Sequence, residues 1–191
     1  ILERFCYHSK CVPNIVDLET FGFEETVKVS DHYKIVSTGN LIPLKAMDIL
    51  IKQFARFKAI VADSSLEIFG DGPERKNLEL LIKSLNIEDS VKLNGICSRQ
   101  IIAATLKRSD AFVLASRNET FGVAYIEALS CGVPVIATRC GGPEAFVHKG
   151  NGILVPVDDE EALLEAMKTM YRNRGLYNRK QIAAETAMKF S

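Results

Sequence analysis

The spacing of apolar residues along the chain predicts amphipathic helices that alternate with short strands. In 46–59 the large apolar residues are Met47, Leu50, Ile51, Phe54 and Phe57. Their three- and four-residue spacing places them on one face of a helix. Further helices are predicted over 74–85, about 99–108, the segment that ends at Gly132, 144–148 and about 160–171.

Short β-branched and apolar runs separate these helices and predict strands. The runs are 34–38, 66–69, 91–95, 111–115, 133–137 and 152–155. Strands joined through helices form a parallel sheet that is covered on both faces, because parallel strands need crossover connections. The runs 111–115 and 133–137 are almost wholly apolar, which is typical of central strands. We therefore predict an α/β fold, a Rossmann-like doubly wound parallel sheet.

Residues 1–33 lack this regular pattern. A short apolar segment around 11–17 is broken by turn formers, and 19–31 is acidic and loop-like. We expect 1–33 to be an entry segment or interdomain linker and 34–191 to be one domain. The chain starts at Ile1 and ends at Ser191 without the usual signs of a natural start or stop, which suggests a piece of a longer protein.

Composition and charge exclude several functional classes. Lys plus Arg and Asp plus Glu both number 24, so no overall field favours nucleic acid or an anionic membrane. No apolar run approaches the length of a membrane span. Five dispersed cysteines indicate free thiols in a reducing compartment. We expect a cytoplasmic protein, and peripheral association of the full-length protein with the cytosolic face of a membrane stays open.

Cys6, His8 and Cys11 are the only residues whose spacing suggests a metal site. No second ligand pair follows at the spacing of a zinc site, so we interpret them as incidental and expect no metal.

Glycine-bearing turns follow four of the predicted strands. They are Gly39-Asn40, Gly70 to Gly72, Gly95 and Gly141-Gly142. The carboxyl ends of parallel strands meet at one edge of the sheet, where open α/β sheets bind their ligands. One crevice could therefore collect all four turns.

The stretch 116–138 carries the chemistry that the pattern predicts best. Glu119 and Glu127 are eight residues apart, which is about 12 Å along a helix. Retaining glycosidases hold their two carboxyls about 5 Å apart and inverting ones up to about 9.5 Å. The two glutamates are therefore not a hydrolytic pair, and we expect them to contact different ends of one extended ligand.

An anion site is predicted between the two glutamates. The amides of Phe121, Gly122 and Val123 lie at the expected first turn of the helix, where backbone donors lack partners. Lys45 opens a helix, where the dipole disfavours a cation unless an anion lies nearby. The alternatives are that Glu119 or Thr120 only caps the helix, that Glu127 lies on a solvated face, and that Lys45 is a surface lysine.

In these residues the chain resembles the C-terminal, donor-binding half of a GT-B-fold retaining glycosyltransferase of family 4. Six motifs carry the resemblance in order: 12–17 (PNGVD), 38–41 with Lys45 (GRL…K), 69–73 (GDGP), 91–95 (V.F.G), 116–132 (S..E.FG…EA…G) and 141–155 (GG..E…G.LV). The resemblance covers nearly the whole chain.

The resemblance implies a nucleotide-diphosphate-sugar site in 34–191. It places the catalytic Glu119 on the sugar hydroxyls and Glu127 on the ribose hydroxyls. The diphosphate would meet Lys45 and the amides beside Thr120, and the base would lie along Gly95-Ile96. Gly39, Asn40, Gly70 and Gly72 would complete the donor site.

The resemblance also bears on substrates and partners. The donor would be a UDP-, GDP- or ADP-sugar, with no metal or cofactor. The sugar would pass, with retained configuration, to a saccharide or lipid-linked acceptor held by an N-terminal domain that this chain lacks. The isolated chain would then be inactive in transfer.

Two departures from the family pattern bear on the site. Asn40 stands where the family has an arginine on the diphosphate, so either affinity is lower or Arg117 or Arg139 compensates. Ala46 and Ile15 replace turn glycines, which should cost little. Asn40 keeps open a second interpretation, a non-catalytic partner or regulatory module. A third, a nicotinamide-binding oxidoreductase, is weakened because no G-x-G-x-x-G follows the first strand.

Overall fold

Six parallel strands form the centre of the computed structural model, which describes residues 15–25 and 32–190. The strands are β1 (Tyr33–Thr38), β2 (Ser64–Phe69), β3 (Val91–Gly95), β4 (Ala111–Leu114), β5 (Val135–Thr138) and β6 (Gly152–Val155). Their order in the sheet is β3-β2-β1-β4-β5-β6. All six predicted strands are confirmed, with ends that differ by at most two residues.

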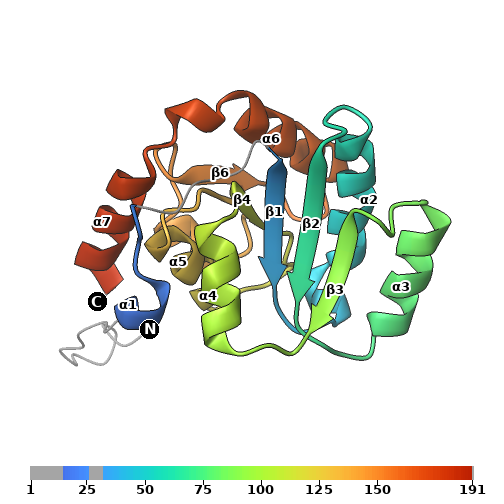
Figure 1. Ribbon diagram of the computed structural model, residues 1–191, viewed down its shortest axis with the longest axis horizontal. Helices are drawn as coiled ribbons and strands as arrows, with labels where there is room; N and C mark the ends of the chain where they lie inside the picture. The colour runs from blue at the N-terminus through green and yellow to red at the C-terminus, as the bar shows by residue number, and fades with distance from the viewer. Residues whose placement is uncertain (1–14, 26–31, 191) are drawn as a thin grey trace, which may run out of the picture.

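Helices cover both faces of the sheet (Figure 1). The α-helices are α1 (Leu18–Phe21), α2 (Met47–Lys58), α3 (Arg75–Ser84), α4 (Arg99–Lys107), α5 (Val123–Ser130), α6 (Glu160–Arg172) and α7 (Arg179–Phe190). Helix α2 packs beside α3 and α6 on one face, and α5 packs beside α4 and α7 on the other. The predicted doubly wound α/β fold is confirmed.

Strands β4 and β5, both inside the sheet, are buried because they are almost wholly apolar. Every residue of β4 and β5 is buried, including Phe112, Val113 and Val135, which have no exposed surface. A strand with helices on both faces needs apolar side chains in both directions, which explains why alternation is absent from these two runs.

Two of the α-helices were not predicted, and the helix predicted over 144–148 is instead the 3-10 helix η3 (Gly142–Ala145). Helix α7 has a weak apolar stripe, because its buried side includes the small residues Ala183 and Thr186 beside Ile182 and Phe190. Helix α1 lies in a segment predicted to be a loop, and the Asp17 carboxylate caps it by accepting hydrogen bonds from two backbone amides. Tertiary contacts and a cap stabilise these helices where periodicity gives little signal.

The described part of the entry segment packs onto the domain. Phe21 is 1% exposed and belongs to the main core, and the Val16 amide donates to the carbonyl of Phe190 at 2.8 Å. Residues 15–25 therefore extend the core of the domain. Cys6, His8 and Cys11, with the metal hypothesis attached to them, lie outside the described residues.

The helices that the structure describes are all too short or too polar to cross a bilayer. Among the same residues, no three His, Cys, Asp or Glu side chains lie where they could share a metal ion. The absence of a metal from the reaction stays a prediction.

Candidate functional site

A pocket of about 390 Å³ opens at the carboxyl ends of β1 and β4. Strand β1 pairs with β2 on one side and β4 on the other, so the order of the sheet reverses at this point. Ligands of open α/β sheets bind at such a switch point. The pocket is lined by Thr38, Gly39, Lys45, Leu114, Glu119, Thr120, Phe121, Gly122, Val123 and Ala124. Seven of the predicted site residues thus meet in one place.

Lys45 and Glu119 form an ion pair in this pocket. Lys45 Nζ lies 2.6 Å from Glu119 Oε1, and the Ser116 hydroxyl donates to the same oxygen at 2.7 Å. The side chains are only 19% and 12% exposed. Lys45 is therefore not a free surface lysine.

Helix α5 begins later than the sequence predicts. Gly122 is its N-cap residue and no side chain caps the helix, so neither Glu119 nor Thr120 has the capping role considered above. Glu119 precedes the helix, so the estimate of its separation from Glu127 along a helix does not apply. Val123 and Ala124, the first two residues of the helix, line the pocket, and their amides have no intrahelical acceptors.

Glycine is needed at position 122 for backbone and packing reasons. Its φ is +88°, and a Cβ there would lie 2.8 Å from the Tyr125 ring. The Tyr125 hydroxyl donates to the Leu114 carbonyl at 2.8 Å, which ties the start of α5 to the end of β4. These contacts fix the helix N-terminus against the pocket.

Lys45 is positioned by a short 3-10 helix, η2 (Pro43–Lys45), that precedes α2. Arg117 braces η2, because its guanidinium donates to the Pro43 carbonyl and its amide donates to the Leu44 carbonyl at 2.8 Å. The Arg117 guanidinium also pairs with Asp158 at 2.8 Å. Arg117 therefore supports the lysine rather than lining the pocket.

The diglycine turn after β5 supports the loop that carries Glu119. The Gly142 amide donates to the Glu119 carbonyl at 2.8 Å, and the Glu119 amide donates to the Cys140 carbonyl at 3.2 Å. A Cβ on Gly142 would lie 2.3 Å from the Phe121 carbonyl oxygen. Glycine here lets the two loops touch.

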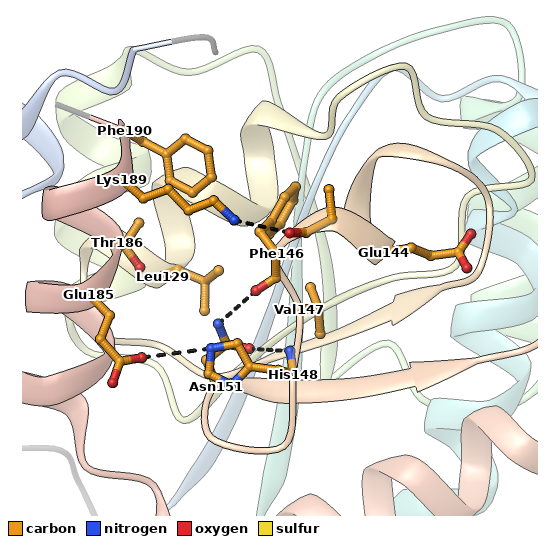
Figure 2. A pocket seen from close by; sticks show the side chains of 11 residues that line it. Leu129, Glu144, Phe146, Val147, His148, Asn151, Glu185, Thr186, Lys189 and Phe190 are labelled. Carbon is orange, nitrogen blue, oxygen red and sulfur yellow. Dashed lines mark hydrogen bonds and ion pairs between the residues drawn. The ribbon is translucent and has the colours of Figure 1, made fainter. Parts of the chain in front are cut away.

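Helix α7 packs against the segment that follows this turn, and Figure 2 shows Lys189 and Phe190 of α7 beside Phe146. A second pocket, of about 240 Å³, separates α7 from the segment 144–151. The Lys189 ammonium donates to the Ala145 carbonyl at 3.0 Å, and the Phe190 ring lies 5.7 Å from that of Phe146. The Phe190 ring also lies 5.9 Å from that of Phe121 in the first pocket. The unpredicted helix thus supports the site loop.

The glycines of the 70–72 turn pack against the turn that follows β1. A Cβ on Gly70 would lie 2.0 Å from the Gly39 carbonyl oxygen, and one on Gly72 would lie 2.4 Å from that of Leu41. Both glycines lie outside the lining of the first pocket. Their observed role is to bring two turns together, and close approach of a ligand stays a prediction.

Four other predicted residues lie outside that lining. Asn40 is exposed, Ile96 is 85% exposed, and Gly95 has a φ of +72° that favours glycine. Glu127 is 14% exposed, so it does not lie on a solvated face. Arg139, a candidate to replace the missing arginine, instead faces Glu144 at 3.9 Å.

Glu127 pairs with Arg99, which the sequence analysis missed. Arg99 Nη2 lies 3.1 Å from Glu127 Oε1. Burial raises the pKa of the Glu127 carboxyl, and the Arg99 charge opposes that rise. The only signal in the sequence was the place of Arg99, three residues after Ile96.

The pocket at the switch point can therefore hold an extended anion between a lysine and a helix N-terminus, with the Glu119 carboxylate beside it. A family model for glycosyl transferases group 1 matches residues 19–187. The chain belongs to this glycosyltransferase family. This membership excludes the oxidoreductase interpretation.

One relative illustrates this membership. The chain is 33% identical over 180 residues to N-acetylgalactosamine-N,N'-diacetylbacillosaminyl-diphospho-undecaprenol 4-alpha-N-acetylgalactosaminyltransferase from Campylobacter jejuni, covering 92% of this chain and 48% of that glycosyltransferase.

Solved structures show the same fold. Sucrose-phosphate synthase from Thermosynechococcus elongatus superposes with a TM-score of 0.84 at 24% identity, covering 94% of this chain and 48% of that structure. Anabaena Alr3699/HepE in complex with UDP-glucose gives a TM-score of 0.75 at 25% identity, covering 84% and 45%. This chain spans about half the length of these three proteins, and its fold is that of the C-terminal half of a GT-B glycosyltransferase.

Proposed function

We propose that this domain binds a nucleoside-diphosphate sugar and that the full-length protein transfers a hexosyl group with retained anomeric configuration. The observation that carries the proposal is the Lys45–Glu119 pair beside the N-terminus of α5, inside a pocket at the switch point of the sheet. A cation, two helix amides and a carboxylate suit a diphosphate that is linked to a polyhydroxylated group.

Each residue has a proposed role. The diphosphate contacts Lys45 and the first amides of α5, and Glu119 accepts hydrogen bonds from the sugar hydroxyls. Glu127 takes the ribose hydroxyls, and the base lies along Gly95-Ile96. The Anabaena structure, solved with UDP-glucose, supports a nucleotide sugar as the donor class. UDP-, GDP- and ADP-sugars are the donors to test.

The chemistry needs charge stabilisation at the leaving group. The bond from the anomeric carbon to the diphosphate oxygen breaks, a bond to the acceptor oxygen forms, and the acceptor proton leaves with the diphosphate. Lys45 and the dipole of α5 stabilise the charge that develops on that diphosphate. We propose that no metal is needed, since these groups supply the positive charge.

The acceptor belongs to the remaining part of the full-length protein. The C. jejuni relative is named for a diphospho-undecaprenol acceptor. We propose a saccharide or lipid-linked acceptor held by an N-terminal domain, with the protein in the cytoplasm or at the cytosolic face of a membrane. The isolated chain would then bind donor without transferring the sugar.

Calorimetry with UDP, GDP and ADP, and then with their sugars, tests donor binding by the 191-residue chain. We expect one base to bind and Glu127→Ala to weaken binding at least about tenfold, since a hydrogen bond to a charged group contributes about 1.5–3 kcal/mol. Binding of none of the three nucleotides by a folded chain would contradict the proposal.

A second candidate is a glycosyltransferase-like module without catalysis. Asn40, in place of a diphosphate-binding arginine, favours it, and Arg117 and Arg139 are both engaged with carboxylates elsewhere. The full-length protein should be incubated with a panel of sugar nucleotides. Sugar transfer or donor hydrolysis with any one sugar nucleotide supports the enzyme. If no sugar nucleotide is transferred or hydrolysed, the result supports the non-catalytic module.

A further inference from the structure

We propose that Arg99 is a positioning residue for ribose recognition, held by Phe21 of the entry segment so that it orients the Glu127 carboxylate. This inference rests on the proposed ribose-binding role of Glu127. It adds a residue that the motifs of the chain do not contain and a link from the entry segment to the donor site.

Arg99 is fixed by two contacts of different kinds. Its guanidinium carbon lies 4.9 Å from the centre of the Phe21 ring, and Nη2 lies 3.1 Å from Glu127 Oε1. A planar guanidinium can stack on a ring and meet a carboxylate with its edge at the same time, which a lysine cannot do. The ring and the carboxylate together define the orientation of Arg99.

Phe21 is itself rigidly placed. Its side chain is 1% exposed, and its carbonyl accepts a hydrogen bond from the Cys131 thiol at 3.2 Å. Helix α1, which ends at Phe21, is capped by Asp17 and packs against both α4 and α5. The position of Arg99 therefore depends on the entry segment.

Arg99 also lies between the two parts of the proposed nucleotide site. It is the first residue of α4, three residues after Ile96 on the segment proposed to line the base. Its partner Glu127 is on α5, the helix whose N-terminus faces the diphosphate. The ion pair between α4 and α5 thus determines the position of the Glu127 carboxylate relative to the segment proposed to line the base.

The pair explains how a mostly buried carboxylate can serve as an acceptor. Glu127 is 14% exposed, and a buried carboxyl without a cation favours its neutral form, which accepts hydrogen bonds poorly. The ion pair engages Oε1, and a carboxylate has a second oxygen with which to accept from a diol. Removing Arg99 should therefore weaken contacts to the ribose hydroxyls and leave base and diphosphate contacts intact.

The first test compares nucleotides with and without those hydroxyls. Calorimetry at pH 7 would measure the affinity of the best-binding of UDP, GDP and ADP and of its 2′,3′-dideoxy counterpart. We expect the unmodified chain to prefer the ribonucleotide, and Arg99→Ala to weaken ribonucleotide binding about five- to tenfold without changing dideoxynucleotide binding. Phe21→Leu should act in the same direction with a smaller effect.

Two variants serve as controls. Arg108→Ala removes another arginine at the far end of α4 and should change neither affinity. Arg99→Lys keeps the charge and should retain part of the preference. An equal loss of both nucleotides in Arg99→Ala would overturn the inference, because it would show that Arg99 acts on the base, the diphosphate or the fold.

The second test does not depend on a nucleotide. Carbon NMR of the Glu127 carboxyl gives its pKa directly, and the charged or titratable groups that face it are Arg99, Asp17 and the Cys131 thiol. We expect a higher pKa in Arg99→Ala than in the unmodified chain and no change in Arg108→Ala. An unchanged pKa would overturn the inference, even if no nucleotide binds and the proposed function itself fails.

Discussion

Lys45 Nζ lies 2.6 Å from Glu119 Oε1, although 74 residues separate them in the chain. The lysine follows β1 and the glutamate follows β4, so the pair exists because these strands are neighbours in the sheet. The two residues predicted to bind phosphate and sugar hydroxyls thus share one pocket. The pair places the positive charge proposed to bind the diphosphate within one hydrogen bond of the carboxylate proposed to bind the sugar.

Lys45→Ala should weaken nucleoside diphosphate binding at least about tenfold. The change removes a charged donor and leaves the Glu119 carboxylate, which is 12% exposed, without its cation and facing the diphosphate. Calorimetry with UDP, GDP and ADP would measure the loss. Lys52→Ala, on the exposed side of α2, is the control and should bind normally. Equal nucleotide affinity of the two variants would show that Lys45 does not contribute to binding.

Gly142→Ala should lower the free energy of unfolding by at least about 2 kcal/mol and weaken donor binding. The new Cβ would lie 2.3 Å from the Phe121 carbonyl oxygen, so the loop that carries Glu119 must shift. Urea denaturation and calorimetry would measure the two effects. Gly175→Ala, which meets nothing within 4 Å, should change stability by less than about 1 kcal/mol. A neutral Gly142→Ala would show that the two loops do not touch.

Phe190→Ala should lower the free energy of unfolding by about 3 kcal/mol. The ring is 4% exposed and packs against the rings of Phe121 and Phe146, so its loss leaves a cavity behind the site loop. Met188 on the same helix is 81% exposed, and Met188→Ala should be nearly neutral. Similar urea midpoints for the two variants would mean that α7 does not support the domain.

Ala46→Gly should lower the free energy of unfolding less than an alanine-to-glycine substitution inside a helix. Ala46 adopts φ 48° before α2, a left-handed conformation that costs a non-glycine residue about 1 kcal/mol, while its buried methyl offsets part of that cost. Ala55→Gly, inside the same helix, should destabilise by about 1 kcal/mol. Thermal unfolding should therefore rank Ala46→Gly as the more stable variant, and the reverse order would argue against a strained turn.

Nucleotide affinity should fall as the pH is lowered from 7 towards 5. Burial raises the pKa of Glu127, so this carboxyl takes up a proton at a higher pH than an exposed glutamate and then accepts fewer hydrogen bonds. The folded state binds this proton more tightly than the unfolded state, so the contribution of Glu127 to the free energy of unfolding decreases as the pH rises through this range. Glu127→Gln should flatten the part of the affinity profile due to this group, and an unchanged profile would exclude Glu127 as its source.

The fold class and most of the pocket could be predicted from patterns in the sequence. The short apolar runs were sufficient to predict all six strands, because burial on both faces of a parallel sheet requires such runs. The motif around Glu119 and the turn before Lys45 identified seven of the residues that line the pocket. These features are local in the chain, so a local pattern can reveal them.

Which side chains contact one another became clear from the three-dimensional structure alone. Arg99 reaches Glu127 and Phe21 from a different helix, and Phe190 reaches Phe121 from the end of the chain. Gly142 likewise contacts Phe121 across two loops, and this contact is possible because glycine has no Cβ. Such contacts depend on the packing of separate elements, and residue type and spacing along one element carry no information about them.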